Sequence, residues 1–135
     1  MASLFMLDTD ICSYIIRENP KELKDVFLTH KLDVICISVI TYAELEYGVL
    51  HNPSKRTKQK LEQFVSLVQV IDWTEGCAHQ YAKIRQALTA VGTPIGNMDM
   101  LIAAAALATD SELVTNNKKH FCLVPGLKIA DWVST

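Results

Sequence analysis

The chain has 135 residues, of which 50% are hydrophobic and 21% are charged, and its formal net charge at pH 7 is -2. A chain of this length buries roughly 68–70% of its unfolded surface when it folds as one unit, so we expect residues 1–135 to form a single domain with a substantial core. The composition excludes a disordered chain and an overall basic nucleic-acid-binding surface. Any contact with nucleic acid therefore depends on local basic groups or on bound metal ions.

Short, continuously apolar runs alternate with helical patterns along the chain. The first run, residues 4–7, is too short for a helix and shows no polar alternation, which is typical of a strand buried on both faces in a parallel sheet. Pro20 opens a predicted helix, Ser54 and Asn97 cap two others, and Gly92 ends a fourth. The predicted strands cover residues 4–7, 34–37, 70–71 and 113–114, with a weaker fifth at 127–129, and the predicted helices cover residues 11–17, 20–30, 38–51, 55–68, 74–91 and 98–108. Strands alternating with helices predict an α/β fold of three layers, with a central parallel sheet of four to five strands and helices on both faces.

The cysteines and the N-terminal residues indicate the compartment. Cys12, Cys36 and Cys77 have apolar neighbours, no two cysteines form a C-x-x-C pair, and the histidines are scattered singly. We therefore expect no zinc site and predict reduced cysteines in the core. No charged leader with a long apolar run precedes Asp8, and no stretch reaches the roughly 18 apolar residues of a membrane span, which predicts a cytoplasmic protein.

Asp8 falls where the first predicted strand ends. In open α/β sheets, ligands bind at the carboxyl ends of the strands, so an acid at this place is a candidate site residue. The alternative is that Asp8 or Asp10 only caps the helix predicted from Ile11. One N-cap is sufficient and Asp8 lies too early for that helix, so we assign the cap to Asp10 and Asp8 to the site.

Three further polar residues are expected at the same edge, because the ends of parallel strands share one side of the sheet. Glu44 follows the second strand, Asp99 begins the apolar helix, and Asn117 follows the fourth strand. Each also has a structural explanation. Glu44 completes a capping box with Thr41, unless the helix already starts at Ser38. The negative charge of Asp99 interacts favourably with the dipole at the N-terminus of its helix, and Asn117 is a common turn residue. The four positions taken together nevertheless favour a site.

Three carboxylates and an amide at one edge predict a cation site, since like charges at close range otherwise raise each other's pKa. Oxygen donors favour Mg²⁺ or Mn²⁺, which are typically held by one or two carboxylates together with a substrate phosphate. Such a site suits phosphodiester hydrolysis, because a bound metal lowers the pKa of a water molecule and a pair of metals about 3.5–4 Å apart stabilises both reacting oxygens. We expect Asp8 and Asp99 to bind the metal directly. Glu44 would act through a bound water or orient the attacking water, and Asn117 would hold an outer water or a second ion.

Four groups of residues match one known family in their order and spacing. They are Met6-Leu7-Asp8-Thr9; Ile37-Ser38 through Ala43-Glu44-Leu45 to Tyr47-Gly48; Pro94-Ile95-Gly96 through Asp99 to Leu101-Ile102-Ala103-Ala104; and Val114-Thr115-Asn116-Asn117 through Phe121 and Pro125-Gly126-Leu127 to Asp131-Trp132. With these pieces the chain resembles the PIN-domain ribonucleases of the VapC toxin family, and the likeness covers nearly its whole length.

The resemblance implies the PIN fold, in which the acids bind Mg²⁺ or Mn²⁺ and cleave RNA. It carries these roles to Asp8, Glu44 and Asp99, and it places Asn117 at a fourth position where relatives have Asp or Asn. It also implies a toxin–antitoxin pair, in which a VapB-type antitoxin wraps the toxin, blocks its site and supplies the domain that binds operator DNA, and in which the toxin forms a homodimer. The spelling of the motifs resembles that of toxins that cut initiator tRNA in the anticodon loop.

Two positions depart from the family pattern. Asp10 stands where relatives usually have Asn or Ser, which adds a carboxylate beside the site, and His120 stands where an acidic residue is common. Among the basic residues, Lys118 and Lys119 have the best claim to an RNA phosphate, because they directly follow Asn117.

Two alternatives from other classes share parts of this pattern. A haloacid-dehalogenase-like phosphatase uses a D-x-D motif such as Asp8-Thr9-Asp10, but its later elements would have to follow in an order that this chain does not keep. A non-catalytic receiver-type signalling domain needs a phosphoacceptor after its third strand and then Thr and Lys, which Asp72, Thr115 and Lys128 mimic. That interpretation leaves the other strand-end acids unexplained.

Overall fold

The computed structural model describes residues 4–92 and 95–133 of the chain. Within these ranges, five strands form one sheet in the order β3-β2-β1-β4-β5, and each neighbouring pair is parallel. The strands are β1 (Phe5–Leu7), β2 (Ile35–Ser38), β3 (Gln69–Ile71), β4 (Glu112–Val114) and β5 (Lys128–Ala130). The predicted parallel sheet is confirmed, and the weak fifth strand pairs with β4.

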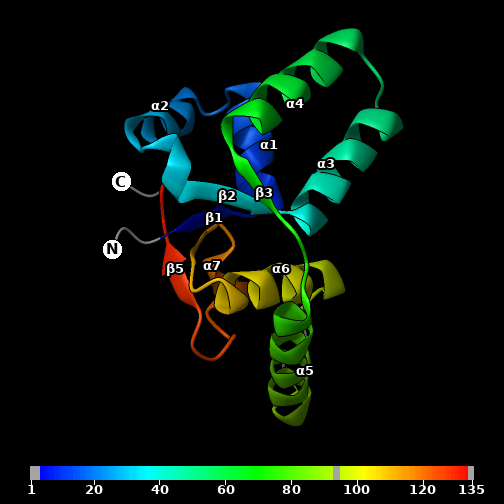
Figure 1. Ribbon diagram of the computed structural model, residues 1–135, viewed down its shortest axis with the longest axis vertical. Coiled ribbons are helices and arrows are strands. Elements are labelled where there is room, and N and C mark those ends of the chain that lie inside the picture. Colours follow the sequence, from blue (N-terminus) through cyan, green and yellow to red (C-terminus); the bar gives the residue numbers. More distant parts are fainter. Residues whose placement is uncertain (1–3, 93–94, 134–135) are drawn as a thin grey trace.

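Helices cover both faces of the sheet, as Figure 1 shows: α1 to α4 lie on one face, and α5 to α7 lie on the other. The three layers predicted from the alternating pattern are therefore present. The helices are α1 (Thr9–Arg17), α2 (Lys21–Thr29), α3 (Val39–His51), α4 (Lys55–Leu67), α5 (Glu75–Ala90), α6 (Asn97–Ala108) and α7 (Lys118–Phe121), with a 3-10 turn at Leu32–Val34.

The alternation of side chains along the strands divides the core into two clusters. Met6 of β1 and Cys36 of β2 pack with residues of α5, α6 and α7. Leu7 and Ile37 pack with residues of α1 to α4 on the opposite face. Because both faces are covered, the strand residues are apolar without alternation, which is why short apolar runs predicted these strands correctly.

Five of the six predicted helix starts differ from the observed ones by one or two residues, and at α1 and α6 the caps change as well. α1 begins at Thr9, and its N-cap is Asp8, whose side chain accepts a hydrogen bond from the N–H of Ile11. The assignment of the cap to Asp10 is therefore wrong, since Asp10 lies within the first turn of the helix. α6 begins at Asn97 itself, and no side chain caps its N-terminus.

Other helix boundaries follow the predicted signals. Ser54 caps α4 by accepting a hydrogen bond from the N–H of Thr57 at 3.0 Å. Gly92 follows the end of α5 with a φ of +68°, a left-handed conformation that glycine adopts without steric cost. The short helix α7 was not predicted, because its four residues are too few to show a helical period.

The strand order separates this fold from the receiver-type alternative. Receiver domains have the order 2-1-3-4-5, whereas here β3 lies at the sheet edge beside β2. Asp72 directly follows β3, so it lies two strands away from β1 and from Asp8. In the described parts of the chain, no helix is long and apolar enough to cross a membrane.

Candidate active site

Asp8 lies at the centre of the candidate site, at the end of β1. In the register of β1 with β4, Leu7 pairs with Val114, and the N–H of Asp8 donates to the carbonyl of Val114 at 3.1 Å. The Asp8 side chain is only 4% exposed. Its Oδ1 accepts a hydrogen bond from the N–H of Ile11 at 2.9 Å, and its Oδ2 accepts one from the hydroxyl of Thr115 at 2.5 Å. Helix capping and a place in the site are alternatives for Asp8 in the sequence. In the structure Asp8 both caps α1 and lies at the end of β1.

Asp99 and Asp10 share an electrostatic environment with Asp8. Burial, with smaller contributions from the charges of Asp10 and Asp99, raises the pKa of Asp8 to about 6 against the opposing effect of its hydrogen bonds. The half-buried Asp99, in the first turn of α6, also has a raised pKa, first through burial and then through the charge of Asp10. His120 acts on Asp99 in the opposite direction. Three carboxylates from β1, α1 and α6 therefore interact at this edge of the sheet.

Glu44 reaches the same region from α3 through a threonine. The hydroxyl of Thr9 donates to Oε1 of Glu44 at 2.5 Å, and Thr9 directly follows Asp8 in the chain. The capping-box explanation of Glu44 is wrong, because Ser38 caps α3 by accepting from the N–H of Ile40 at 3.1 Å and Thr41 lies inside the helix. Glu44 is left free for a role in the site.

A cavity of about 260 Å³ between α1, α3 and α4 adjoins this region. Glu44 and Asp10 line it together with the hydroxyl groups of Thr9 and Ser13 and with Arg17, and aliphatic side chains complete its wall. The cavity thus opens beside two of the carboxylates.

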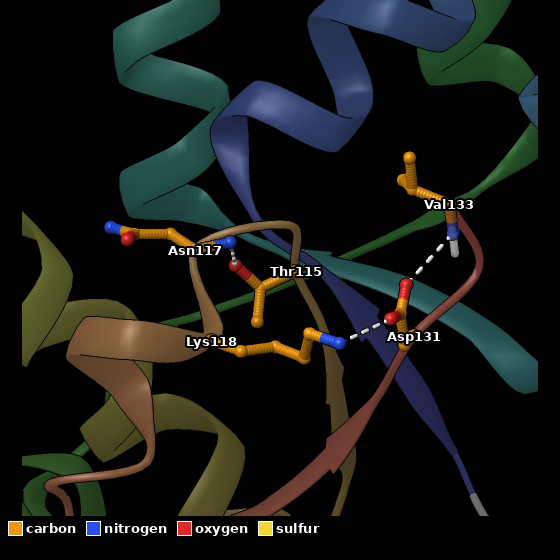
Figure 2. A network of polar contacts seen from close by, with 5 residues as sticks. All are labelled: Thr115, Asn117, Lys118, Asp131 and Val133. Atoms are coloured by element: carbon orange, nitrogen blue, oxygen red, sulfur yellow. Dashed lines mark hydrogen bonds and ion pairs between the residues drawn. The ribbon is translucent and has the colours of Figure 1, made fainter.

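Asn117 follows β4, and its N–H and its side chain each make a hydrogen bond. Its main-chain N–H donates to Oγ1 of Thr115 at 2.9 Å, and its Nδ2 donates to Nδ1 of His120 at 3.0 Å. Asn117 is the N-cap residue of α7, but its side chain makes no capping hydrogen bond. In Figure 2 the Asn117 side chain extends away from Lys118 and Asp131.

The sequence interpretation assigned no site role to Thr9, Thr115 or His120, although each contacts a predicted site residue. Thr115 directly follows β4, as Asp8 follows β1. The strand-end criterion that selected Asp8 could therefore have selected Thr115. Thr9 gave no such signal, because its contact with Glu44 depends on how α1 and α3 pack, and the contact of His120 with Asn117 depends on the short helix α7, which has no helical period in the sequence.

The two lysines after Asn117 differ in their surroundings. Nζ of Lys118 pairs with Oδ2 of Asp131 at 2.6 Å, whereas Lys119 is exposed and belongs to none of the ion pairs among the described residues. Lys118 therefore holds the loop after β4, and Lys119 is the better candidate for contact with an RNA phosphate.

The donor chemistry of the site fits a hard divalent cation. The side chains that approach one another are carboxylates, an amide and hydroxyls, which are the oxygen ligands that Mg²⁺ and Mn²⁺ prefer. Over residues 4–92 and 95–133, no three His, Cys, Asp or Glu side chains form a preformed metal-binding group. Mg²⁺ does not require one, since it commonly keeps several waters and binds one or two carboxylates. Asp8 and Asp99 meet that requirement.

The fold and this edge define a class: a three-layer α/β protein with an acidic, oxygen-donor site at the carboxyl ends of its parallel strands. Comparison with known proteins agrees. The PIN domain family model matches residues 5–127. Ribonuclease VapC2 of Rickettsia felis is 40% identical over 131 residues, covering 96% of this chain and 98% of that protein. The tRNA(fMet)-specific endonuclease VapC of Salmonella typhimurium is 36% identical, covering 95% and 97%.

Solved structures give the same result. The crystal structure of VapBC2 from Rickettsia felis, bound to a DNA fragment from its promoter, matches with a TM-score of 0.88 and 39% identity over 96% of this chain and 98% of that chain. The DNA-bound VapBC structure from Salmonella typhimurium matches with a TM-score of 0.86 and 35% identity, covering 97% and 99%. The chain belongs to the PIN-domain family and, within it, to the VapC ribonucleases.

Proposed function

We propose that this chain is the toxin of a toxin–antitoxin pair and an endoribonuclease that hydrolyses RNA phosphodiester bonds with Mg²⁺ or Mn²⁺. The observation that carries the proposal is the buried Asp8 carboxylate, coupled to Asp10 and Asp99 at the carboxyl edge of the sheet. Two relatives are named as a ribonuclease and as a tRNA(fMet)-specific endonuclease, which supports an RNA substrate. The proposed target is initiator tRNA, cut in its anticodon loop in the cytoplasm.

The proposed roles divide the site between metal binding and substrate. Asp8 and Asp99 hold the metal, and Asn117 holds an outer water or a second ion. When bound, a divalent cation of this kind polarises a phosphoryl oxygen and lowers the pKa of a coordinated water. Glu44, fixed by Thr9, orients the attacking water. Hydrolysis forms a bond between the water oxygen and phosphorus and breaks the bond to the leaving ribose oxygen, which takes up a proton.

The proposed partners are a VapB-type antitoxin and a second copy of the toxin. The Rickettsia felis and Salmonella typhimurium structures are VapBC complexes with DNA, which supports an antitoxin partner and contact with operator DNA through the antitoxin. On α3, the apolar side chains Tyr47 and Leu50 are 65% and 77% exposed, so they offer surface to a partner chain.

The phosphatase alternative has less support from this site. It gives no role to Asp99, whose charge acts on Asp8. Family membership also assigns the chain to another class.

Induced expression in a bacterium tests the proposal directly. We expect growth arrest with the wild-type chain and normal growth with Asp8→Ala at equal protein levels. Sequencing of RNA 5′ ends after induction should show one dominant cleavage position in a tRNA, and EDTA should stop cleavage by the purified protein. Growth arrest that persists with Asp8→Ala, or cleavage that resists EDTA, would contradict the proposal.

A further inference from the structure

We infer that Thr115 is a positioning residue of the proposed nuclease site, which holds the Asp8 carboxylate and the main chain of Asn117 in one fixed arrangement. This inference rests on the proposed function. The Thr115 hydroxyl contacts both residues, and it lies between the ends of two adjacent parallel strands.

Both hydrogen-bonding functions of this hydroxyl are used in fixed directions. Its hydrogen is donated to Oδ2 of Asp8 at 2.5 Å, across 107 residues of sequence, and its oxygen accepts from the N–H of Asn117 at 2.9 Å. A hydroxyl has a single hydrogen, and an N–H can only donate, so the hydrogen of Thr115 must point to Asp8. The side chain is fully buried, with 0% exposure, so water does not compete for these bonds.

The backbone that carries Thr115 is itself held at both ends. The N–H of Thr115 donates to the carbonyl of Ala130 in β5 at 3.3 Å. Four residues after the end of β4, Lys118 pairs with Asp131, which in turn accepts from the N–H of Val133 at 2.9 Å (Figure 2). The loop from Thr115 to Lys118 therefore cannot move far without breaking contacts with β5 and the segment after it.

This arrangement fixes the orientation of the Asp8 carboxylate. The N–H of Ile11 occupies one lone pair of Oδ1, and Thr115 occupies one lone pair of Oδ2. An ionised carboxylate offers about four lone-pair sites, so one site on each oxygen remains for a cation. Hydrogen bonds that orient metal-binding carboxylates affect metal binding itself, and their loss typically costs about 10–100-fold in metal affinity or activity.

The test uses two substitutions at Thr115 and a matched control elsewhere. Thr115→Val keeps the shape of the side chain but removes the hydroxyl, whereas Thr115→Ser keeps the hydroxyl. Thr109→Val is the control, because the Thr109 hydroxyl also makes partly buried hydrogen bonds, to the carbonyl of Ala105 at 2.8 Å and to Ser111 at 2.7 Å. At a helical rise of 1.5 Å per residue, Thr109 lies about 15 Å along α6 from Asp99.

Binding of Mn²⁺ to the full chain without RNA, measured by electron paramagnetic resonance of free Mn²⁺, is the first readout. We expect Thr115→Val to weaken Mn²⁺ binding by about 10–100-fold and to lower kcat for RNA cleavage more than it raises KM. Thr115→Ser should stay within about threefold of the wild type in Mn²⁺ affinity and kcat, and Thr109→Val should bind and cleave as the wild type does.

The outcomes separate this inference from the proposed function. Wild-type Mn²⁺ affinity in Thr115→Val overturns the positioning role, and so does a Thr115→Ser protein as weak as Thr115→Val, because the retained hydroxyl would then not preserve metal binding. A wild-type chain that binds no Mn²⁺ overturns the metal site and this role together. Circular dichroism melting checks folding, and if Thr115→Val does not fold, Thr115→Ala takes its place against Thr115→Ser under the same criteria.

Discussion

Asp8→Asn is expected to lower the rate of RNA cleavage on the order of 10³-fold, and Asp99→Asn should have a similar effect. Each change removes a negative charge from the proposed cation site while keeping the size of the side chain. Asparagine is also an effective N-cap, so Asp8→Asn can still accept the hydrogen bond from Ile11. The loss should therefore come from metal binding and not from unfolding of α1.

Single-turnover cleavage of a tRNA substrate at saturating Mg²⁺ measures this effect. The control is Asp110→Asn, because the Asp110 side chain is 86% exposed and is paired only with Lys128 in the ion pairs that the structure defines. Asparagine tolerates its left-handed backbone, with a φ of 53°. Asp110→Asn should cleave at the wild-type rate. Equal losses in the control and in the site variants would show that the effect has another origin.

The same Asp8→Asn change is expected to stabilise the protein at neutral pH. The folded-state pKa of Asp8, about 6, lies above its ordinary value of 3.8, so between these values the folded state binds more protons than the unfolded state. Stability of the wild type therefore falls as the pH rises through this window, and the full cost is about 3 kcal/mol once the pH exceeds 6. Asparagine does not titrate and avoids this cost.

Urea denaturation of both proteins in EDTA, at several pH values, isolates the contribution of Asp8. The difference in unfolding free energy should move in favour of Asp8→Asn by about 2 kcal/mol between pH 4 and pH 6 and then level off. A difference that stays constant with pH, or one that moves in favour of the wild type, would mean that the buried carboxylate is not destabilised. In that case the ionised Asp8 carboxylate would not reduce the stability of the fold, and there would be no trade-off between stability and function at this position.

Much of the fold was accessible from sequence because local patterns and tertiary structure agree. The apolar runs at residues 4–7 and 34–37 mark β1 and β2 within one residue. Ser54 caps the helix that it was predicted to cap, and Ser38, one of two alternatives for the cap of the helix after β2, is the one that caps α3. The strand order could not be predicted, because β1 and β2 are apolar on both sides and the pattern does not show which neighbour each strand pairs with.

The predicted site differs from the observed one in how its residues are linked. The strand-end rule selected Asp8 and Asn117, and in the structure both contact the hydroxyl of Thr115. It gave Asp8 a single role, whereas Asp8 also caps α1, because the helix starts at Thr9 and leaves no loop between strand and helix. The contacts of Thr115 with Asp8 and of Thr9 with Glu44 could not be predicted from the sequence, because they depend on strand register and helix packing. The first of them joins residues that are 107 positions apart.

The most direct test of the account is a crystal structure of the full chain grown with Mn²⁺, with anomalous diffraction recorded at an energy that identifies manganese. We expect an anomalous peak at about 2 Å from carboxylate oxygens of both Asp8 and Asp99, with Asn117 on the same side of the ion. Manganese bound elsewhere, with none at the carboxylates of Asp8 and Asp99, would contradict the proposed nuclease site. So would a structure in which these two carboxylates lie on separate surfaces.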